Sequence, residues 1–122
     1  MLIDIISVFP EYFDVLNLSL LGKAQDKGLI TFNVHNLSDW THDVHHSVDD
    51  TPVGGGAGMV MKPEVWANCL DDLLDIPPLE DVSDANPYIG ENSHTTLVFP
   101  NPSAPTFTQA DATELSYTEH LI

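Results

Sequence analysis

The segment THDVHHSVDDTPVGGGAGM, residues 41–59, holds the densest group of side chains that could do chemistry. It combines three histidines and three aspartates with four glycines: His42, His45, His46, Asp43, Asp49, Asp50, Gly54, Gly55, Gly56 and Gly58. Histidine and aspartate are suitable ligands for zinc or magnesium. Clustered glycines let a backbone approach a ligand closely. The segment is therefore a candidate binding loop, and the alternative is a flexible loop whose polar side chains satisfy its own backbone.

The spacing within this segment matches none of the standard motifs for metals or phosphates. The histidines form no HExxH pair on a helix. Lys62 is neither preceded by glycine nor followed by serine or threonine, so GGGAGMVMK is not a P-loop, and Met59 prevents a GxGxxG match. No metal ligand is assigned from the sequence. A metal-dependent hydrolase that uses the cluster from His42 to Asp50 stays open as an alternative.

The composition is strongly acidic. The chain has 122 residues, with 19 aspartates and glutamates, three lysines, no arginine and a formal net charge of −16. Proteins bind the phosphates of nucleic acids through lysine and arginine. Because this chain has few basic residues and a large negative charge, it should by itself repel nucleic acid. Any nucleic-acid function would need basic surface from outside these residues. A non-catalytic acidic module that binds a protein partner is a further alternative.

The remaining composition indicates an ordinary cytoplasmic domain. The length suits one domain, and 43% hydrophobic residues are enough for a core. Cys69 is the single cysteine, which excludes an internal disulfide and fits a reducing compartment. No apolar run approaches the roughly 18 residues of a membrane span. The start, MLIDIISVFP, carries Asp4 and no basic region, so no secretory signal is expected.

The apolar pattern of the first 36 residues predicts the order strand, helix, strand. The run LIDIISV at 2–8, broken only by Asp4 and Ser7, is typical of a strand buried on both faces of a parallel sheet. Gly28 stands where a left-handed helix stop is expected. The expected elements are a strand over 2–8, a helical segment over 10–16, a helix over 19–26, and a strand over 29–36 with Ile30, Phe32 and Val34 on one face.

After residue 36 a long connection precedes further alternation of helices and strands. No periodicity is seen from 37 to about 58, and residues 77–94 are rich in proline and acidic residues, which predicts a solvated loop insertion. Trp66, Leu70, Leu73 and Leu74 share one helical stripe. The expected elements are a short strand over 59–61, a helix over 63–76, a strand over 95–99, a helix from the Thr108–Asp111 capping box to about 117, and a strand from 120. This order predicts an α/β fold, a mostly parallel sheet with flanking helices.

Three blocks of the sequence closely resemble the bacterial tRNA (guanine-37-N1)-methyltransferase family. They are IISVFPEYF at 5–13, GKAQDKGLI at 22–30 and THDVHHSVDDTPVGGGAGMVMKPE at 41–64, and the third is the most specific. VFPNPSAPTFTQADATEL at 98–115 is similar to the cofactor-loop region of the family in a divergent form. The resemblance covers nearly the whole chain, apart from the acidic insertion at 77–94.

The resemblance implies a homodimeric, cytoplasmic, knotted methyltransferase. Members of the family transfer a methyl group from S-adenosylmethionine to N1 of guanosine 37 of tRNA, with magnesium as a further implied ion. The cofactor lies in a trefoil knot, and an aspartate of a C-terminal domain serves as the base. The family's GRYEG segment would follow Ile122. The resemblance therefore implies that residues 1–122 are a truncated, inactive N-terminal part of the cofactor domain, with an incomplete knot, no C-terminal domain and no catalytic residue.

The resemblance also assigns binding residues within the chain. The cofactor-contacting loop of the family corresponds to Phe99, Pro100, Asn101 and Pro102, of which only Pro102 matches the usual family sequence. Asp49 corresponds to an aspartate of the active-site cleft, and Lys23 stands where the family generally has arginine. The residues expected to bind tRNA are Lys23, Asp49, Gly54, Gly55, Gly56 and Gly58.

Overall fold

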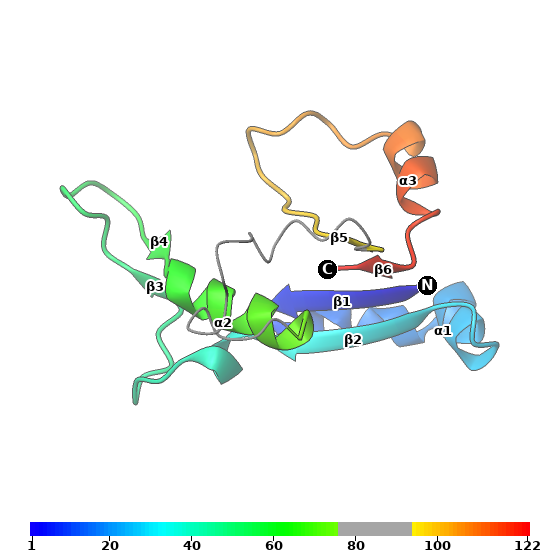
Figure 1. Cartoon of the computed structure of the whole chain (residues 1–122), viewed down its shortest axis with the longest axis horizontal. Helices are drawn as coiled ribbons and strands as arrows, with labels where there is room; N and C mark the ends of the chain where they lie inside the picture. Colours follow the sequence, from blue (N-terminus) through cyan, green and yellow to red (C-terminus); the bar gives the residue numbers. More distant parts are fainter. Residues whose placement is uncertain (76–93) are drawn as a thin grey trace, which may run out of the picture. The chain divides into compact units, whose positions relative to one another are not determined.

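The computed structural model describes residues 1–75 and 94–122, shown in Figure 1. The chain divides into two compact units, Met1–His35 with Glu91–Ile122 and Asn36–Gly90, and each is treated by itself. The insertion predicted at 77–94 lies outside the described residues except for His94, which is exposed. Among the described residues, no helix is both long and apolar enough to cross a membrane.

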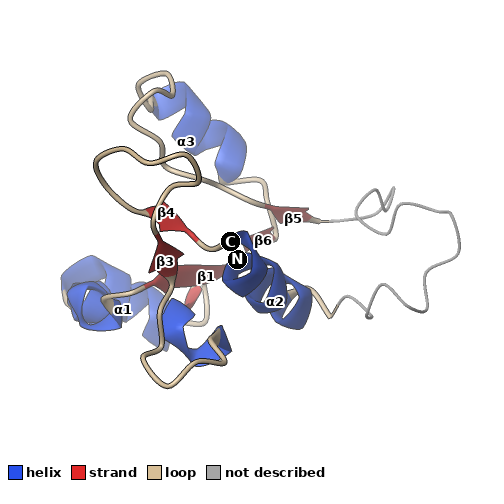
Figure 2. Cartoon of the chain, turned by 90° about the vertical axis from the view of Figure 1, so that its left-hand side faces the viewer, coloured by secondary structure: helices blue, strands red, loops and turns tan. Residues whose placement is uncertain are grey.

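The first unit is built on a four-stranded sheet in the order β2-β1-β6-β5. The strands are β1 (Leu2–Ser7), β2 (Thr31–Asn36), β5 (Thr95–Thr96) and β6 (His120–Leu121). β6 pairs in parallel with both β1 and β5, and β1 and β2 point the same way in Figure 1. In Figure 2, α1 (Ser19–Asp26) lies beside β1, and α3 (Gln109–Leu115) lies above β5 and β6. The predicted α/β class with a mostly parallel sheet is confirmed.

The prediction that β1 is buried on both faces is wrong. Asp4 is the buried residue of this strand, and its apolar neighbours are half-buried. The reason is incomplete cover, because the helical segments that follow β1 bury none of their own side chains. These segments are the 3₁₀ helix η1 (Pro10–Asn17) and α1.

The first crossover forms almost as expected. α1 spans the predicted residues, and Gly28 adopts a φ of 68° just beyond it. The next strand begins at Thr31 rather than Leu29. The Leu29 amide still donates to the Ala24 carbonyl at 3.0 Å, so this amide closes the end of the helix instead of pairing in the sheet.

Gly22 permits a tight junction between η1 and α1. An added Cβ would stand 2.3 Å from the backbone oxygen of Asn17 and 2.9 Å from its carbonyl carbon. Replacing a helical glycine by alanine normally stabilises by about 1 kcal/mol. We expect Gly22→Ala to lower the free energy of unfolding by about 1–3 kcal/mol, because backbone atoms must shift. Urea denaturation measures the change.

Gly28→Ala is the matched control for this prediction. A Cβ there meets no atom within 4 Å, so only the positive φ opposes it. Its cost should be about 1 kcal/mol. A Gly22→Ala protein as stable as the wild type would contradict the assigned packing of the junction.

The second unit contains a hairpin and a helix. β3 (Asp49–Asp50) pairs antiparallel with β4 (Val60–Met61), and α2 spans Pro63–Leu73. The region from 37 to 58 was expected to lack regular structure, yet it contains β3 and the 3₁₀ helix η2 (Leu37–Trp40). The Asn36 side chain starts η2 by accepting a hydrogen bond from the Ser38 amide at 3.1 Å.

In the second unit, the face of α2 that is buried in the core lies next to the face that was predicted to be buried. Leu37 of η2 and Val65 and Cys69 of α2 are buried. Trp66, Leu70, Leu73 and Leu74 were predicted to form the packed stripe, but they are only half-buried. Val65 and Cys69 are four residues apart and so share one helix face. The described helix ends at Leu73 rather than at the predicted residue 76.

In the last part of the first unit, strand β5 is shorter than predicted. β5 covers only Thr95–Thr96 of the strand expected over 95–99, although the Val98 amide still donates to the Ile122 carbonyl at 2.7 Å. The capping box is confirmed, since the Asp111 carboxylate accepts from the Thr108 amide at 2.7 Å and the Thr108 hydroxyl accepts from the Asp111 amide. α3 ends at Leu115, before the predicted residue 117.

Candidate functional site

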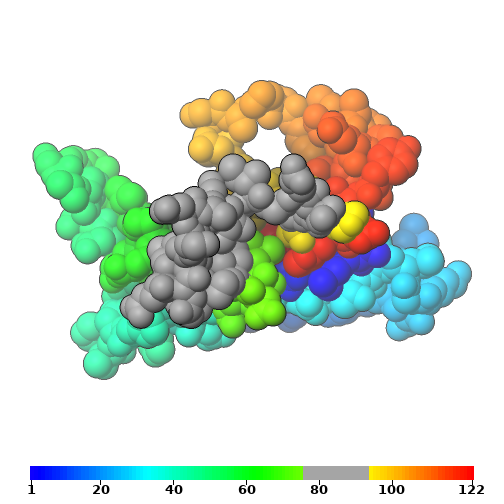
Figure 3. All heavy atoms as spheres, in the orientation of Figure 1, coloured from blue at the N-terminus to red at the C-terminus, as the bar shows by residue number. Residues whose placement is uncertain are grey.

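The predicted glycine loop connects β3 to β4 and is open to solvent. Gly54, Gly55, Gly56 and Gly58 have φ angles of 95°, 79°, 128° and 98°. These values lie in the region that other residues rarely adopt. A Cβ at any of the four would meet no atom within 4 Å, and the loop is exposed in the space-filling view of Figure 3. The glycines therefore serve the backbone conformation of an open loop.

A pocket of about 530 Å³ lies at the base of this hairpin. It is lined by residues 50–53 and 60–64. Asp50 therefore faces the pocket, while Asp49, the residue singled out from the sequence, is not among the residues that line it. Asp49 pairs with Met61 across the hairpin, and Asp50 with Val60. The hairpin thus places Asp50, rather than Asp49, among the residues that line this pocket.

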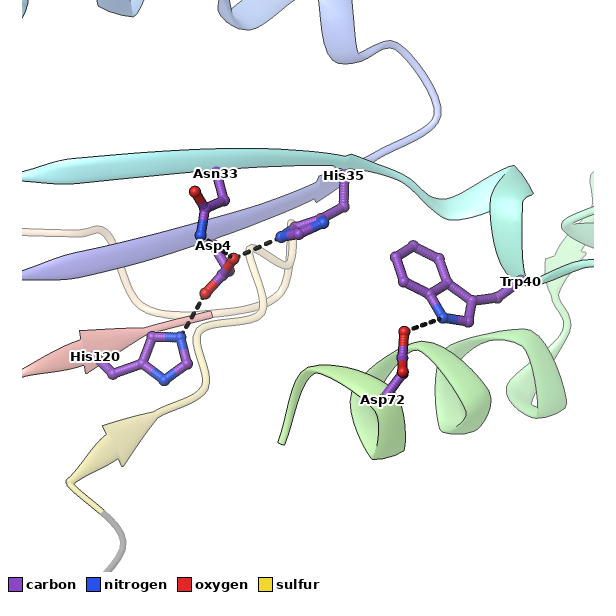
Figure 4. Close-up of polar contacts among 6 residues, drawn as sticks. All are labelled: Asp4, Asn33, His35, Trp40, Asp72 and His120. Atoms are coloured by element: carbon purple, nitrogen blue, oxygen red, sulfur yellow. Dashed lines mark hydrogen bonds and ion pairs between the residues drawn. The ribbon is translucent and has the colours of Figure 1, made fainter. Parts of the chain in front are cut away.

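A second pocket, of about 420 Å³, lies between the start of α2 and the turn that follows η2. Its lining residues are Trp40, Thr41, His42, Asp43, Ser47, Lys62, Glu64, Val65 and Asn68. The Trp40 indole donates to the Asp72 carboxylate at 3.2 Å, as Figure 4 shows, which fixes one wall. Hydrogen bonds from Ser47, together with the charge of Lys62, hold the pKa of Asp43 below its ordinary value. Lys62 lines both pockets.

The histidines of this region do not gather around a common point. His42 lines the 420 Å³ pocket, while His46 has its Nδ1 3.0 Å from the Thr41 hydroxyl. Across residues 1–75 and 94–122, no group of three or more histidines, cysteines or acidic residues is placed to hold a metal ion. The hydrolase alternative based on His42, His45, His46, Asp49 and Asp50 therefore finds no ligand set in this geometry. The same finding gives no support to a magnesium site in the described part of the chain.

The predicted cofactor loop follows β5 and borders a third pocket. This pocket of about 450 Å³ is lined by residues 96–99 and 105–107 and by three residues of α3. Phe99 lines it, whereas Pro100, Asn101 and Pro102 do not. The Asn101 side-chain oxygen accepts from the Ser103 amide at 2.8 Å, and the Asn101 backbone carbonyl accepts from the Ala104 amide at 2.9 Å. The loop is therefore a turn that leads from one wall of the pocket to the next.

Lys23 lies apart from the other predicted residues of its unit. It is exposed in the last turn of α1, which Figure 1 shows at the β2 end of the sheet. The turn at Phe99–Pro102 follows β5, the strand at the opposite end. The structure thus brings no second predicted residue to Lys23 within the first unit.

The sequence did not predict a buried polar cluster in the middle of the sheet. The Asp4 carboxylate contacts His35 Nε2 at 2.5 Å through Oδ1 and His120 Nε2 at 2.6 Å through Oδ2, as drawn in Figure 4. The Asn33 amide also donates to Oδ1 at 3.0 Å. Asp4 is 5% exposed. Its signal in the sequence was an acidic residue inside a strand expected to be buried, because a buried charge requires partners.

The environment of Asp4 favours its charged form. Burial raises the pKa of the carboxyl, but hydrogen bonds from His35, His120 and Asn33 and the charge of His35 outweigh that effect. The net pKa lies below the ordinary value of 3.8. Asp4 therefore acts as an ionised acceptor that links β1 to both neighbouring strands.

Comparison with known proteins identifies a family for these features. The family model described as tRNA (guanine-1)-methyltransferase TrmD matches residues 1–122. A tRNA (guanine-N(1)-)-methyltransferase of Bifidobacterium animalis subsp. lactis is 68% identical over 121 residues, which cover 98% of this chain and 43% of that protein. The protein of the same name from Bifidobacterium longum subsp. infantis is 66% identical over 122 residues, which cover all of this chain and 43% of that protein.

A more distant relative is also much longer than this chain. The tRNA (guanine-N(1)-)-methyltransferase of Leifsonia xyli subsp. xyli is 49% identical over 122 residues, which cover all of this chain and 47% of that protein. The chain thus spans less than half the length of these three curated relatives. Because the family model covers every residue, this chain belongs to the tRNA (guanine-1)-methyltransferase TrmD family.

Proposed function

We propose that this chain is the N-terminal part of a tRNA (guanine-N1)-methyltransferase that methylates N1 of guanosine 37 and uses S-adenosylmethionine as the methyl donor. The observation that carries the proposal is the family match over residues 1–122, joined by identities of 66–68% to curated relatives of that name. Homodimer formation, a trefoil knot and a cytoplasmic location belong to the same proposal. The base that removes the N1 proton lies outside these residues.

The pocket beside Phe99 has some of the properties that an S-adenosylmethionine site requires. Its volume of about 450 Å³ falls within the range of small-molecule sites. Leu97, Phe99 and Phe107 offer apolar surface for an adenine ring, and Glu114 offers a carboxylate for ribose hydroxyls. When bound, the cofactor supplies an electrophilic methyl group. The chain's own contribution is to bind and orient it between the two walls that the turn after β5 connects.

The tRNA contacts proposed for this chain lie on the β3–β4 hairpin and on Lys23. An open loop of glycines lets a backbone approach a nucleotide closely. The chain carries a net charge of −16, so the basic surface that binds phosphates must come mainly from the rest of a longer protein. The role proposed for this chain is to place the target guanine and the cofactor rather than to supply electrostatic affinity.

A chimeric enzyme tests the proposed function. Residues 1–122 would replace the matching 43% of the Bifidobacterium longum subsp. infantis protein, and transfer of labelled methyl groups to tRNA would be measured. We expect the chimera to methylate tRNA with guanosine at position 37, because the exchanged parts are 66% identical. Mapping of the labelled nucleotide identifies the site.

Two controls make the result decisive. The unmodified relative shows that the assay works, and tRNA with adenosine at position 37 shows that transfer depends on the target base. A folded chimera without activity, beside an active relative, would overturn the proposal and favour a non-catalytic acidic module.

A further inference from the structure

A continuous hydrogen-bonded path runs from Asp4 to β5. Asp4 Oδ2 contacts His120 Nε2 at 2.6 Å, and His120 Nδ1 lies 3.0 Å from the Thr95 hydroxyl. An ionised carboxylate can only accept, so Nε2 of His120 donates to Asp4, while Nδ1 and the Thr95 hydroxyl share the second hydrogen bond. The path therefore links β1, β6 and β5, and Figure 4 shows its first step.

The segment that starts at Thr95 leads directly to the pocket beside Phe99. The Ile122 amide donates to the Thr96 carbonyl at 3.0 Å, and the Val98 amide donates to the Ile122 carbonyl at 2.7 Å. Both bonds tie this segment to the strand that carries His120. Thr96, Leu97, Val98 and Phe99 then form one wall of the pocket. The position of that wall thus depends on how β6 is held.

The second histidine of the cluster provides an internal comparison. His35 contacts the other oxygen of Asp4, but it belongs to β2, at the end of the sheet opposite β5. The side chains of His35 and His120 are similarly buried, with 23% and 19% exposure. The two histidines make the same kind of contact with Asp4, and the contact of His120 continues to Thr95 of β5.

We propose that Asp4, acting through His120 and Thr95, is a positioning residue that fixes the β5 wall of the S-adenosylmethionine pocket. The inference rests on the proposed function, since it assigns the pocket beside Phe99 to the cofactor. Asp4 is only 5% exposed, so solvent competes weakly for its hydrogen bonds. Loss of the path would let the wall shift, and small misplacements in a binding site cost activity steeply.

The test compares three variants of the chimeric enzyme. His120→Gln keeps a donor for Asp4 but loses the Thr95 contact, and Thr95→Val removes the hydroxyl while keeping the shape of the side chain. His35→Gln is the matched control, because it changes the same kind of contact on the other side of Asp4. KM and Kd for S-adenosylmethionine, KM for tRNA, kcat and Tm would be measured for each.

We expect His120→Gln and Thr95→Val to raise the KM and Kd for S-adenosylmethionine about tenfold, because the pocket wall moves. The KM for tRNA should stay within about twofold, and His35→Gln should change cofactor affinity less than twofold, which is about 0.4 kcal/mol at 1.4 kcal/mol per tenfold. If His120→Gln fails to fold, Thr95→Val carries the test alone.

Equal cofactor affinity in all three variants and the wild type would overturn the inference, as would an equal loss in His35→Gln. In either case the wild-type chimera would still transfer methyl groups. A wild-type chimera that transfers none would instead overturn the proposed function, and this inference with it.

Discussion

Asp4→Ala should destabilise the first unit by about 3 kcal/mol, the lower end of the cost of removing one partner from a buried charged pair. The variant leaves His35, His120 and Asn33 facing an apolar side chain in place of the acceptor that they share. The two histidines keep about a fifth of their surface in contact with solvent, which limits the loss. Urea denaturation followed by circular dichroism measures the change.

The contribution of Asp4 should also depend on pH in one direction. Its pKa in the folded protein lies below 3.8, so the unfolded chain binds the proton more tightly. The stabilisation is therefore complete above the unfolded pKa and is lost as pH falls through the lower folded pKa. The stability difference between wild type and Asp4→Asn should therefore shrink as the pH falls below about 4.

Asp26→Ala is the control for Asp4→Ala. Asp26 is exposed at the end of α1, and its loss should change stability by less than about 0.5 kcal/mol. An Asp4→Ala protein as stable as Asp26→Ala would mean that the cluster contributes nothing to the sheet. If Asp4→Ala does not fold, the conservative Asp4→Asn serves for the comparison.

Gly56→Val is expected to raise the KM of the chimeric enzyme for tRNA about tenfold or more, because a β-branched residue at this φ costs about 1–3 kcal/mol. Gly56 has a φ of 128°, and no neighbouring atom within 4 Å would hold a side chain in place. The loop can therefore relax to another conformation. Steady-state kinetics with tRNA as the varied substrate measures the effect.

The Tm of the chimera distinguishes a loss of tRNA binding in Gly56→Val from unfolding of the protein. Because the loop is open, Gly56→Val should change the Tm of the chimera little, in contrast to Gly22→Ala, whose new Cβ meets backbone atoms. Unchanged kinetics in Gly56→Val would show that the loop conformation does not serve tRNA binding. A large fall in Tm would show that the loop packs against the fold.

The order of elements could be predicted from the sequence because it depends on local patterns. The helix over Ser19–Asp26, its stop at Gly28 and the Thr108–Asp111 capping box each follow from residues within a few positions of one another. The parallel sheet followed from the alternation of strands and helices. The glycine loop was also recognisable, since runs of glycine indicate positive φ.

The polar contacts across the sheet were decided by the tertiary structure. Asp4, His35 and His120 are up to 116 positions apart in the sequence and meet only because the order β2-β1-β6-β5 places their strands together. No local pattern specifies that order. For the same reason the sequence indicated Asp4 only as a break in an apolar run, although the sheet makes it a shared acceptor.

Local sequence patterns likewise could not predict which residues are buried and which residues line the pockets. The sequence favoured Trp66 and Leu70 for the packed face of α2, but contact with η2 in the second unit selects Val65 and Cys69. The resemblance named Asp49 as a cleft residue, which stays a prediction, and the structure places its neighbour Asp50 in the lining of the pocket at the base of the hairpin. The residue types of a site are written in the sequence, whereas the side of a strand or helix that faces a pocket depends on what packs against it.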